Sequence, residues 1–268
     1  MHRSVRRVFS RRFASLLIAA ALAPAAWSQT DDGGYIFEGN ERKPEEMAAA
    51  RAKIPPVSVA LPTDRLKRLP ATMKKLRDGG TLRMVMLGDS IINDTARSCW
   101  HELVEKHYPK CHIVRVVSVR GSTGCWFYKE PGKIDKYVLQ QRPDLVIIGG
   151  ISQRHDVASI RECMKQIRTA SPCEFFLMTG PFGGANPLSG EDWRKKLDGG
   201  KDEQYAAELK SLADAFDAEF FDMQLAWGQY LRGAGKPLDV FKRDPVHANA
   251  EGEAVLARIL EQYFTPPK

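Results

Sequence analysis

The segment LRMVMLGDSIINDTARS, residues 82–98, combines two patterns that together indicate the fold. It begins with a short apolar run that ends at Gly88, which is typical of a buried β-strand. Asp89 and Ser90 follow at once, and both residue types favour the start of a helix. The segment therefore predicts a strand that passes through a tight turn into a helix.

The same alternation continues along the rest of the chain. Short apolar runs predict strands at residues 82–87, 112–119, 144–150, 174–180 and 218–223. A last helix is expected from Asn249 to Tyr263. Elsewhere apolar residues recur at the helical spacings of three and four, namely Ala96, Cys99, Trp100, Leu103, Val104 and His107; Val157, Ile160, Met164 and Ile167; and Leu209, Leu212, Ala213 and Phe216. The pattern predicts an α/β fold in which a five-stranded, mostly parallel sheet lies between two layers of helices.

The first 28 residues have the features of a secretory signal peptide. Five arginines occur in MHRSVRRVFSRRF, and the apolar run Ala14–Ala26 follows. That run is too short to span a bilayer, and Ala26-Trp27-Ser28 is a small-x-small cleavage site. We expect export to the periplasm or the extracellular space, by the twin-arginine or the ordinary route, and no stable membrane insertion after cleavage. An uncleaved N-terminal anchor is the alternative.

Residues 29–80 are rich in proline, glycine and charged residues, and only residues 45–53 and 64–76 suggest short helices. Such a composition does not support a core of its own. We therefore expect an extended leader that packs on the main domain, residues 81–268.

The positive charge of the chain is concentrated in the signal peptide. Removal of residues 1–28 takes away five arginines and no acidic residue, so the formal net charge falls from +7 to +2. Beyond that segment, no block of lysine and arginine is interleaved with aromatic residues. We therefore expect no nucleic-acid partner.

The five cysteines give no clear metal or redox signature. Two local disulfides, Cys99–Cys111 and Cys163–Cys173, are compatible with the spacing, and buried free thiols are the alternative. No C-x-x-C pair is present, and the two histidines of HELVEKH, residues 101–107, are too far apart for the H-E-x-x-H ligand face. We expect no metal and no cofactor.

Ser90 is a candidate nucleophile because of its place at the end of the first predicted strand. Ligands of open parallel sheets bind at the carboxyl ends of the strands. A serine at a helix start also presents its backbone N–H at the positive end of the helix, where an oxyanion can be held. The alternative is that Ser90 only caps the helix. Asp94 leaves a similar choice, between orienting this turn and favouring the helix start.

The segment DPVH near the C-terminus supplies the other two parts of a catalytic set. Asp244 lies three residues before His247, and Pro245 restricts the backbone between them. The carboxylate can therefore fold back onto the imidazole Nδ1–H and leave Nε2 free as a general base. Together with Ser90, these residues can form a nucleophile, a base and a residue that orients the base.

On these residues, the chain from 82 to 264 resembles the SGNH/GDSL hydrolases, which are serine esterases and carbohydrate deacetylases with a flavodoxin-like, three-layer fold. The block GDSIINDT implies that Ser90 is the nucleophile and that its N–H holds the oxyanion. The block DPVHAN implies that Asp244 and His247 complete the triad. In VRGSTGCW, the resemblance implies a second oxyanion donor, Gly124 in preference to Gly121.

The third block departs from the pattern of the family, which is G-x-N-D. The sequence here is GGISQ, so Ser152 stands in place of the asparagine that supplies the third oxyanion donor, and Gln153 stands in place of the aspartate. The Ser152 hydroxyl can donate but is shorter, and Gln153 has an amide one position late. Either a neighbouring group compensates, with Asn93 as the first candidate, or the enzyme is slow. The loss of one donor commonly costs about 2.7–4 kcal/mol in the transition state.

We therefore expect an exported serine hydrolase that removes a short acyl group, such as acetyl, from a small-molecule or glycan ester. Trp126, Phe127 and Tyr128 follow the second block and form either a sugar-stacking wall or ordinary packing. An acyltransferase with the same triad and a non-catalytic glycan-binding protein are the alternatives for the function.

Overall fold

The computed structural model describes residues 28–39, 42–56, 58–181 and 186–265. Its described strands form one sheet in the order β1-β2-β4-β3-β5-β6-β7. The strands are β1 (Ser28–Gln29), β2 (Tyr35–Glu38), β3 (Gly80–Gly88), β4 (Cys111–Val119), β5 (Leu145–Ile148), β6 (Glu174–Met178) and β7 (Glu219–Phe221).

The five predicted strands are confirmed as β3 to β7, and all pairs among them are parallel. Their order, β4-β3-β5-β6-β7, is that of flavodoxin-like sheets. The predicted strand number was too low, because β1 and β2 extend the sheet beyond β4 in antiparallel pairing. The sheet therefore has seven described strands, five of them in the predicted parallel part.

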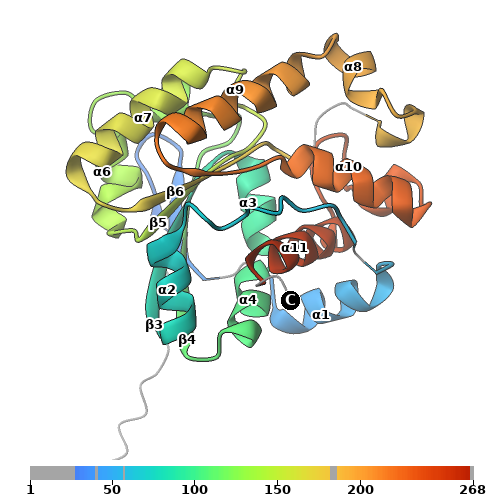
Figure 1. Ribbon diagram of the computed structural model, residues 1–268, viewed down its shortest axis with the longest axis horizontal. Coiled ribbons are helices and arrows are strands. Elements are labelled where there is room, and N and C mark those ends of the chain that lie inside the picture. The colour runs from blue at the N-terminus through green and yellow to red at the C-terminus, as the bar shows by residue number, and fades with distance from the viewer. Residues whose placement is uncertain (1–27, 40–41, 57, 182–185, 266–268) are drawn as a thin grey trace, which may run out of the picture.

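Helices cover both faces of the sheet, as predicted: α7 and α9 lie on one face, and α3, α4 and α11 lie on the other (Figure 1). The helices are α1 (Pro44–Lys53), α2 (Pro70–Asp78), α3 (Ser90–Arg97), α4 (Trp100–His107), α5 (Cys125–Tyr128), α6 (Lys133–Tyr137), α7 (Val157–Ala170), α8 (Trp193–Asp198), α9 (Lys201–Ala215), α10 (Met223–Ala234) and α11 (Ala250–Phe264). Short 3₁₀ turns are η1 (Leu139–Gln141), η2 (Pro187–Ser189) and η3 (Leu238–Val240).

Strand β3 shows why the central strands are continuously apolar. Met84 and Met86 face the core under α3, α4 and α11, whereas Val85 and Leu87 face the core under α5, α6 and α7. Because both faces are covered there, every residue from Met84 to Gly88 is buried, which is typical of parallel sheets.

The helical spacing from Ala96 to His107 covers two helices rather than one. The chain adopts a left-handed conformation at Cys99, with φ of 56°, and this separates α3 from α4.

Residues 29–80 contribute to the same sheet and core as the rest of the chain. Phe37 of β2 and Met73 of α2 are buried in the larger core cluster. Helix α1 packs on α11, where Met47 and Ala254 share a small apolar cluster. The two predicted short helices correspond to α1 and α2, and α2 begins only at Pro70 because proline suits the first turn.

All five cysteines are buried free thiols. The two disulfides that the spacing allowed are therefore not formed. The predicted signal peptide lies outside the described residues, except for Ser28, which begins β1. None of the helices that the structure describes is long and apolar enough to cross a membrane.

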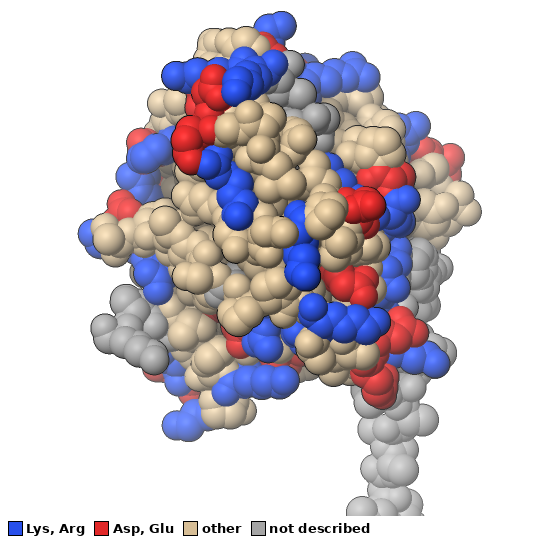
Figure 2. Space-filling view, turned by 90° about the vertical axis from the view of Figure 1, so that its right-hand side faces the viewer, with Lys and Arg blue, Asp and Glu red and all other residues tan. Residues whose placement is uncertain are grey.

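Charged side chains of both signs are interspersed on the face that carries α8 and α10 (Figure 2). Lysine and arginine do not gather there into a patch of one sign, so that face offers no strongly basic surface.

Candidate active site

Asp89, and not Ser90, caps the helix that follows β3. Its carboxylate is fully buried, and Oδ1 accepts hydrogen bonds from the N–H groups of Ile91 at 2.9 Å and Ile92 at 3.3 Å. This is the usual arrangement of an N-cap. The Ser90 hydroxyl is therefore available for another contact.

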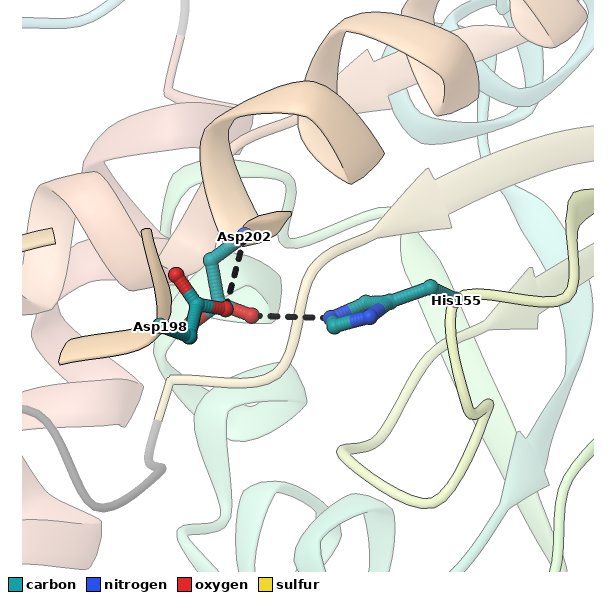
Figure 3. A group of neighbouring side chains, drawn as sticks. All are labelled: His155, Asp198 and Asp202. Atoms are coloured by element: carbon teal, nitrogen blue, oxygen red, sulfur yellow. Dashed lines mark hydrogen bonds and ion pairs between the residues drawn. The ribbon is translucent and has the colours of Figure 1, made fainter. Parts of the chain in front are cut away.

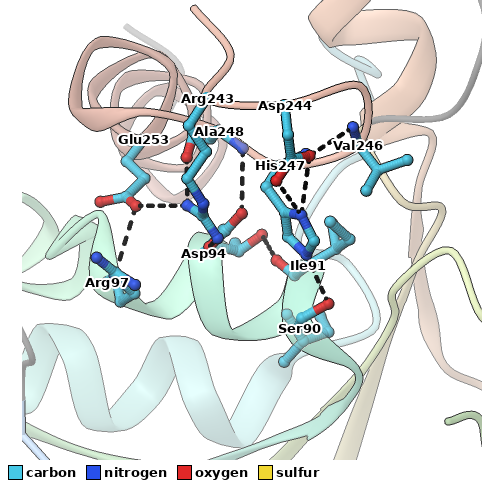
Figure 4. Close-up of polar contacts among 12 residues, drawn as sticks. Ser90, Ile91, Asp94, Arg97, Arg243, Asp244, Val246, His247, Ala248 and Glu253 are labelled. Carbon is cyan, nitrogen blue, oxygen red and sulfur yellow. Dashed lines mark hydrogen bonds and ion pairs between the residues drawn. The ribbon is translucent and has the colours of Figure 1, made fainter. Parts of the chain in front are cut away.

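Two hydrogen-bond contacts link Ser90 to His247 and His247 to Asp244, as Figure 4 shows. The Oγ atom of Ser90 is 2.9 Å from Nε2 of His247, and Nδ1 of His247 is 2.8 Å from Oδ2 of Asp244. A proton on Nδ1 and a lone pair on Nε2 satisfy both contacts. The structure thus brings together the three residues that the sequence motifs singled out, from the start of α3 and the loop before α11.

The carboxylate of Asp244 is held by its own loop. Its Oδ1 atom accepts hydrogen bonds from the N–H of Val246 at 2.9 Å and from the N–H of His247 at 2.8 Å. The hydrogen bond from the Val246 N–H is the main cause that lowers the pKa of Asp244 to about 2, and the contacts with His247 add to it. Asp244 is therefore a stable anion beside the imidazole at neutral pH.

Asp94 connects the helix of Ser90 to the loop of His247. Its carboxylate is buried and accepts hydrogen bonds from Arg243 Nη2 at 2.9 Å and from the Ala248 N–H at 3.1 Å (Figure 4). Burial raises the pKa of Asp94, and the Arg243 guanidinium opposes that rise. Because Arg243 and Ala248 flank the segment Asp244–His247, this contact fixes both ends of the segment against α3.

A second buried carboxylate, Glu253 of α11, extends the same network. Its oxygens lie 3.7 Å from Arg243 Nη1 and 3.5 Å from Arg97 Nε, and it also pairs with Arg42. Sequence reasoning missed Arg243, Glu253 and Arg42, because no local pattern links residues so far apart in the chain.

The backbone N–H groups of Ser90 and Gly124 are candidates for an oxyanion site. Within the described residues, neither group donates a hydrogen bond to another part of the protein. Ser90 lies at the first turn of α3, and Gly124 precedes α5. Both are at the carboxyl edge of the parallel strands, β3 and β4 respectively.

Gly124 packs directly against the loop after β5. A Cβ atom at Gly124 would lie 2.7 Å from Gln153 Oε1 and 2.8 Å from the Ser152 carbonyl oxygen. A Cβ atom at Gly121 would meet nothing within 4 Å. Of the two glycines that the sequence singled out, only Gly124 therefore lies where the packing leaves no room for a side chain.

We expect Gly124→Ala to lower the free energy of unfolding by about 1–3 kcal/mol, because the added methyl group overpacks the loop after β5. Gly121→Ala is the matched control, since it adds the same methyl group in open space. Thermal unfolding of the two variants measures the difference. Equal melting temperatures would contradict the packing argument.

Gln153 holds the loops of the site together. Its buried amide accepts a hydrogen bond from the Cys125 N–H at 2.9 Å through Oε1, and it donates to the Gly149 carbonyl at 2.9 Å through Nε2. Both ends of the amide are therefore engaged inside the protein.

Ser152 lies next to the Ser90 turn. Its N–H donates to Asp89 Oδ2 at 2.7 Å, and its half-buried position leaves the side chain partly accessible. Gly150 makes this contact possible, because a Cβ atom there would lie 2.4 Å from Asp89 Oδ1. Asn93 is half-buried on α3, one turn after Ser90.

No protein-family model and no curated protein matches the sequence. Solved structures with the same fold do exist, and those most relevant to the site are carbohydrate esterases. The likeness, at 16–20% identity, establishes the fold.

Three of these structures illustrate the match. A two-domain esterase (CEX) active on acetylated mannans, co-crystallised with mannopentaose, has 17% identity and a TM-score of 0.57, and the match covers 76% of this chain and 56% of that chain. The acetyl xylan esterase AlAXEase has 16% identity and a TM-score of 0.53, with 68% and 99% covered. Axe2, an acetylxylan esterase from Geobacillus stearothermophilus, has 20% identity and a TM-score of 0.55, with 70% and 96% covered.

Proposed function

We propose that the protein is a serine esterase of the SGNH type that removes a short acyl group, most of all acetyl, from a carbohydrate. The observation that carries this proposal is the line of contacts from Ser90 Oγ through the His247 imidazole to the Asp244 carboxylate. The shared fold supports it, because the similar solved structures include esterases of acetylated mannans and acetylated xylan. The choice of a carbohydrate rests on that likeness.

In the proposed reaction, Ser90 Oγ attacks the acyl carbonyl while His247 Nε2 takes the hydroxyl proton. The tetrahedral intermediate collapses as its bond to the sugar oxygen breaks and His247 gives that oxygen the proton, which releases the sugar hydroxyl and leaves an acyl-Ser90 ester. Water then attacks this ester with His247 as the base, and the acyl–Oγ bond breaks as His247 returns the proton to Ser90 Oγ, which releases the carboxylic acid. Asp244 remains ionised throughout and stabilises the imidazolium that forms twice in the cycle.

Three donors are proposed to hold the oxyanion: the N–H groups of Ser90 and Gly124, and the Ser152 hydroxyl. The two N–H groups have no acceptor within the described part of the chain, which supports their role. Ser152 is preferred to Gln153, because the Gln153 amide is engaged with Gly149 and Cys125. Asn93 is a further candidate by its place on α3.

We also propose that residues 1–28 direct export to the periplasm or the extracellular space and are then removed. Residues 29–80 would form a leader on a hydrolase domain at residues 81–268. The intact mass of the exported protein tests the cleavage site, and retention of Met1–Ser28 would contradict it.

Covalent labelling tests the proposed function. The intact protein is treated with a fluorophosphonate, and the modified residue is located by peptide mass spectrometry. We expect one adduct on Ser90 and the release of acetate from acetylated xylo- and manno-oligosaccharides. An absence of both labelling and acetate release would contradict the enzyme and favour a glycan-binding protein. Acyl transfer to added sugar faster than to water would favour an acyltransferase.

Asp94→Asn is expected to lower kcat by about 10²-fold with little change in KM. The variant loses the charge that holds Arg243, so the loop of His247 is less well placed for proton transfer. Steady-state kinetics with an acetyl ester measure the effect.

Asp144→Asn is the matched control for this prediction. Asp144 also accepts a backbone hydrogen bond and pairs with a cation, Lys75, but it lies at the opposite end of the sheet. If both variants lose the same amount of activity, the specific role of Asp94 is wrong.

A further inference from the structure

The three aromatic residues after Gly124 have different environments. The Tyr128 hydroxyl is buried and donates to the Gly88 carbonyl at 2.6 Å. Phe127 is covered by the cations of Arg120 and Lys133, which lie 4.9 Å and 4.8 Å from its ring centre. Trp126 is half-buried, and its indole N–H bonds it to the loop of Ser152.

Trp126 carries a cation close to the candidate active site. Its indole Nε1–H donates to the Ser152 carbonyl at 2.9 Å, and the guanidinium carbon of Arg154 lies 3.8 Å from the ring centre. Ser152 in turn donates its N–H to Asp89, the residue before Ser90. The stacked pair thus lies at the edge of the Ser90 turn.

The loop that presents Arg154 has an unusual backbone that its neighbours hold in place. Arg154 and His155 have φ values of 56° and 54°, a left-handed conformation that residues other than glycine rarely adopt. Gln153 is fixed on one side by its amide contacts. On the other side, His155 Nε2 lies 2.9 Å from Asp202 Oδ1 of α9, and Asp198 accepts the Asp202 N–H (Figure 3).

Contacts within the protein explain why the three side chains in Figure 3 lie close together. His155, Asp198 and Asp202 bond to one another or to nearby backbone, and Asp202 also accepts a hydrogen bond from Gln224 at 2.7 Å. Their role is to anchor the loop, with Arg154 directed outward between the two anchors.

Arg154 has free hydrogen-bonding capacity. The side chain is exposed, and no acidic partner for it occurs among the residues that the structure describes. Stacking on Trp126 occupies one face of the guanidinium but leaves its in-plane N–H donors open. A guanidinium held over a ring in this way is suited to an oxyanion with two acceptor oxygens, because its planar set of N–H donors matches a carboxylate or a sulfate.

We propose that Arg154, stacked on Trp126, forms a subsite for an anionic substituent of the glycan, either a uronate carboxylate or a sulfate ester. The idea that this subsite positions an ester for hydrolysis rests on the proposed esterase function. The idea that Arg154 binds an anionic sugar does not depend on it. The chemical class of substrate is then an acylated acidic glycan rather than a neutral one.

Binding of unacetylated oligosaccharides tests the subsite without catalysis. Titration calorimetry with the full protein would compare an oligogalacturonide, a sulfated galactan oligosaccharide and a neutral xylo-oligosaccharide. We expect Arg154→Gln to raise the Kd of one anionic ligand by about tenfold or more and to leave the neutral ligand unchanged. The anionic ligand that responds identifies the source of the charge.

Matched variants separate the subsite from a general charge effect. Arg161→Gln removes the same charge from α7, where the guanidinium also lies over an aromatic ring, that of Phe216, at 6.0 Å. This variant is expected to change the Kd less than about twofold, because salt screens distant charges. Arg154→Lys keeps the charge but loses the planar fork, so an intermediate Kd is expected.

The outcomes distinguish this proposal from the esterase proposal. If neither anionic oligosaccharide binds, or if Arg154→Gln and Arg161→Gln weaken binding equally, the subsite is wrong whatever the enzyme does. If the anionic ligand binds through Arg154 but Ser90 is neither labelled nor active, the esterase proposal fails and the subsite stands.

Discussion

Replacement of Ser90 by alanine is expected to lower kcat for acetyl-ester hydrolysis by about 10⁴- to 10⁶-fold. The variant removes the atom that forms the acyl-enzyme and leaves His247 Nε2 without the partner that lies 2.9 Å away. Folding should be nearly unaffected, because Asp89 caps α3 and the Ser90 hydroxyl makes no other hydrogen bond among the described residues. Acetate release and thermal unfolding, measured on the same preparation, check both statements.

Ser98→Ala, at the residue that ends the same helix, is the matched control. The Ser98 hydroxyl donates to the Thr95 carbonyl at 2.6 Å, so its loss is expected to cost about 1 kcal/mol of stability and little activity. A Ser90→Ala protein that hydrolyses esters at the rate of the wild type would overturn the assignment of Ser90.

The central strands were predictable because their environment leaves a strong mark on the sequence. Strand β5 and residues 84–88 of β3 are covered on both faces, so they appear as unbroken apolar runs. The edge strands β1 and β2 leave no such mark. They have two and four residues, and β2 is fixed by its pairing with β4, more than 75 residues away, as in Phe37↔Val117.

The candidate triad was predictable because each member lies in a short motif with its own chemistry. The residues that hold the triad in place were not. Asp94 pairs with Arg243 across 149 residues, and Arg42 reaches Glu253 across 211 residues. Contacts of this length depend on the folded topology, and no local spacing indicates them.

Two choices between neighbouring residues also needed the structure. Asp89 and Ser90 are equally good caps by type, and only the direction of the Asp89 carboxylate shows which one serves. Gln153 occupies a position from which an amide was expected to reach the oxyanion. Its side chain is instead turned inward, because the N-terminus of α5 and the Gly149 carbonyl both need a partner.

Asp244→Asn is expected to lower kcat by about 10⁴-fold while the loop keeps its conformation. In the wild type, Asp244 Oδ1 accepts the two backbone N–H groups of Val246 and His247, and an asparagine carbonyl oxygen can accept both. The amide NH₂ would then face His247 Nδ1 and favour the tautomer with its proton on Nε2. That tautomer cannot take the proton of Ser90, so the base is lost although the geometry remains.

The pH dependence of stability independently checks whether the Asp244 carboxylate is ionised and held by its loop. The Val246 N–H lowers the pKa of Asp244 in the folded protein to about 2, from the ordinary aspartate value of 3.8. Because the folded pKa is depressed, the stabilisation from the ionised carboxylate is fully present above pH 3.8 and is lost as the pH falls through about 2. The melting temperature of the wild type should therefore fall relative to that of Asp244→Asn between these two pH values.

Asp239→Asn is the control, since it removes a nearby exposed carboxylate from η3 and leaves the triad intact. Its kcat should equal that of the wild type near neutral pH, where Asp244→Asn is almost inactive. If Asp244→Asn retains most of its activity while Ser90 remains essential, another group must orient the imidazole. Asp94 is then the carboxylate to test, because it is buried on α3 and accepts the Ala248 N–H beside His247.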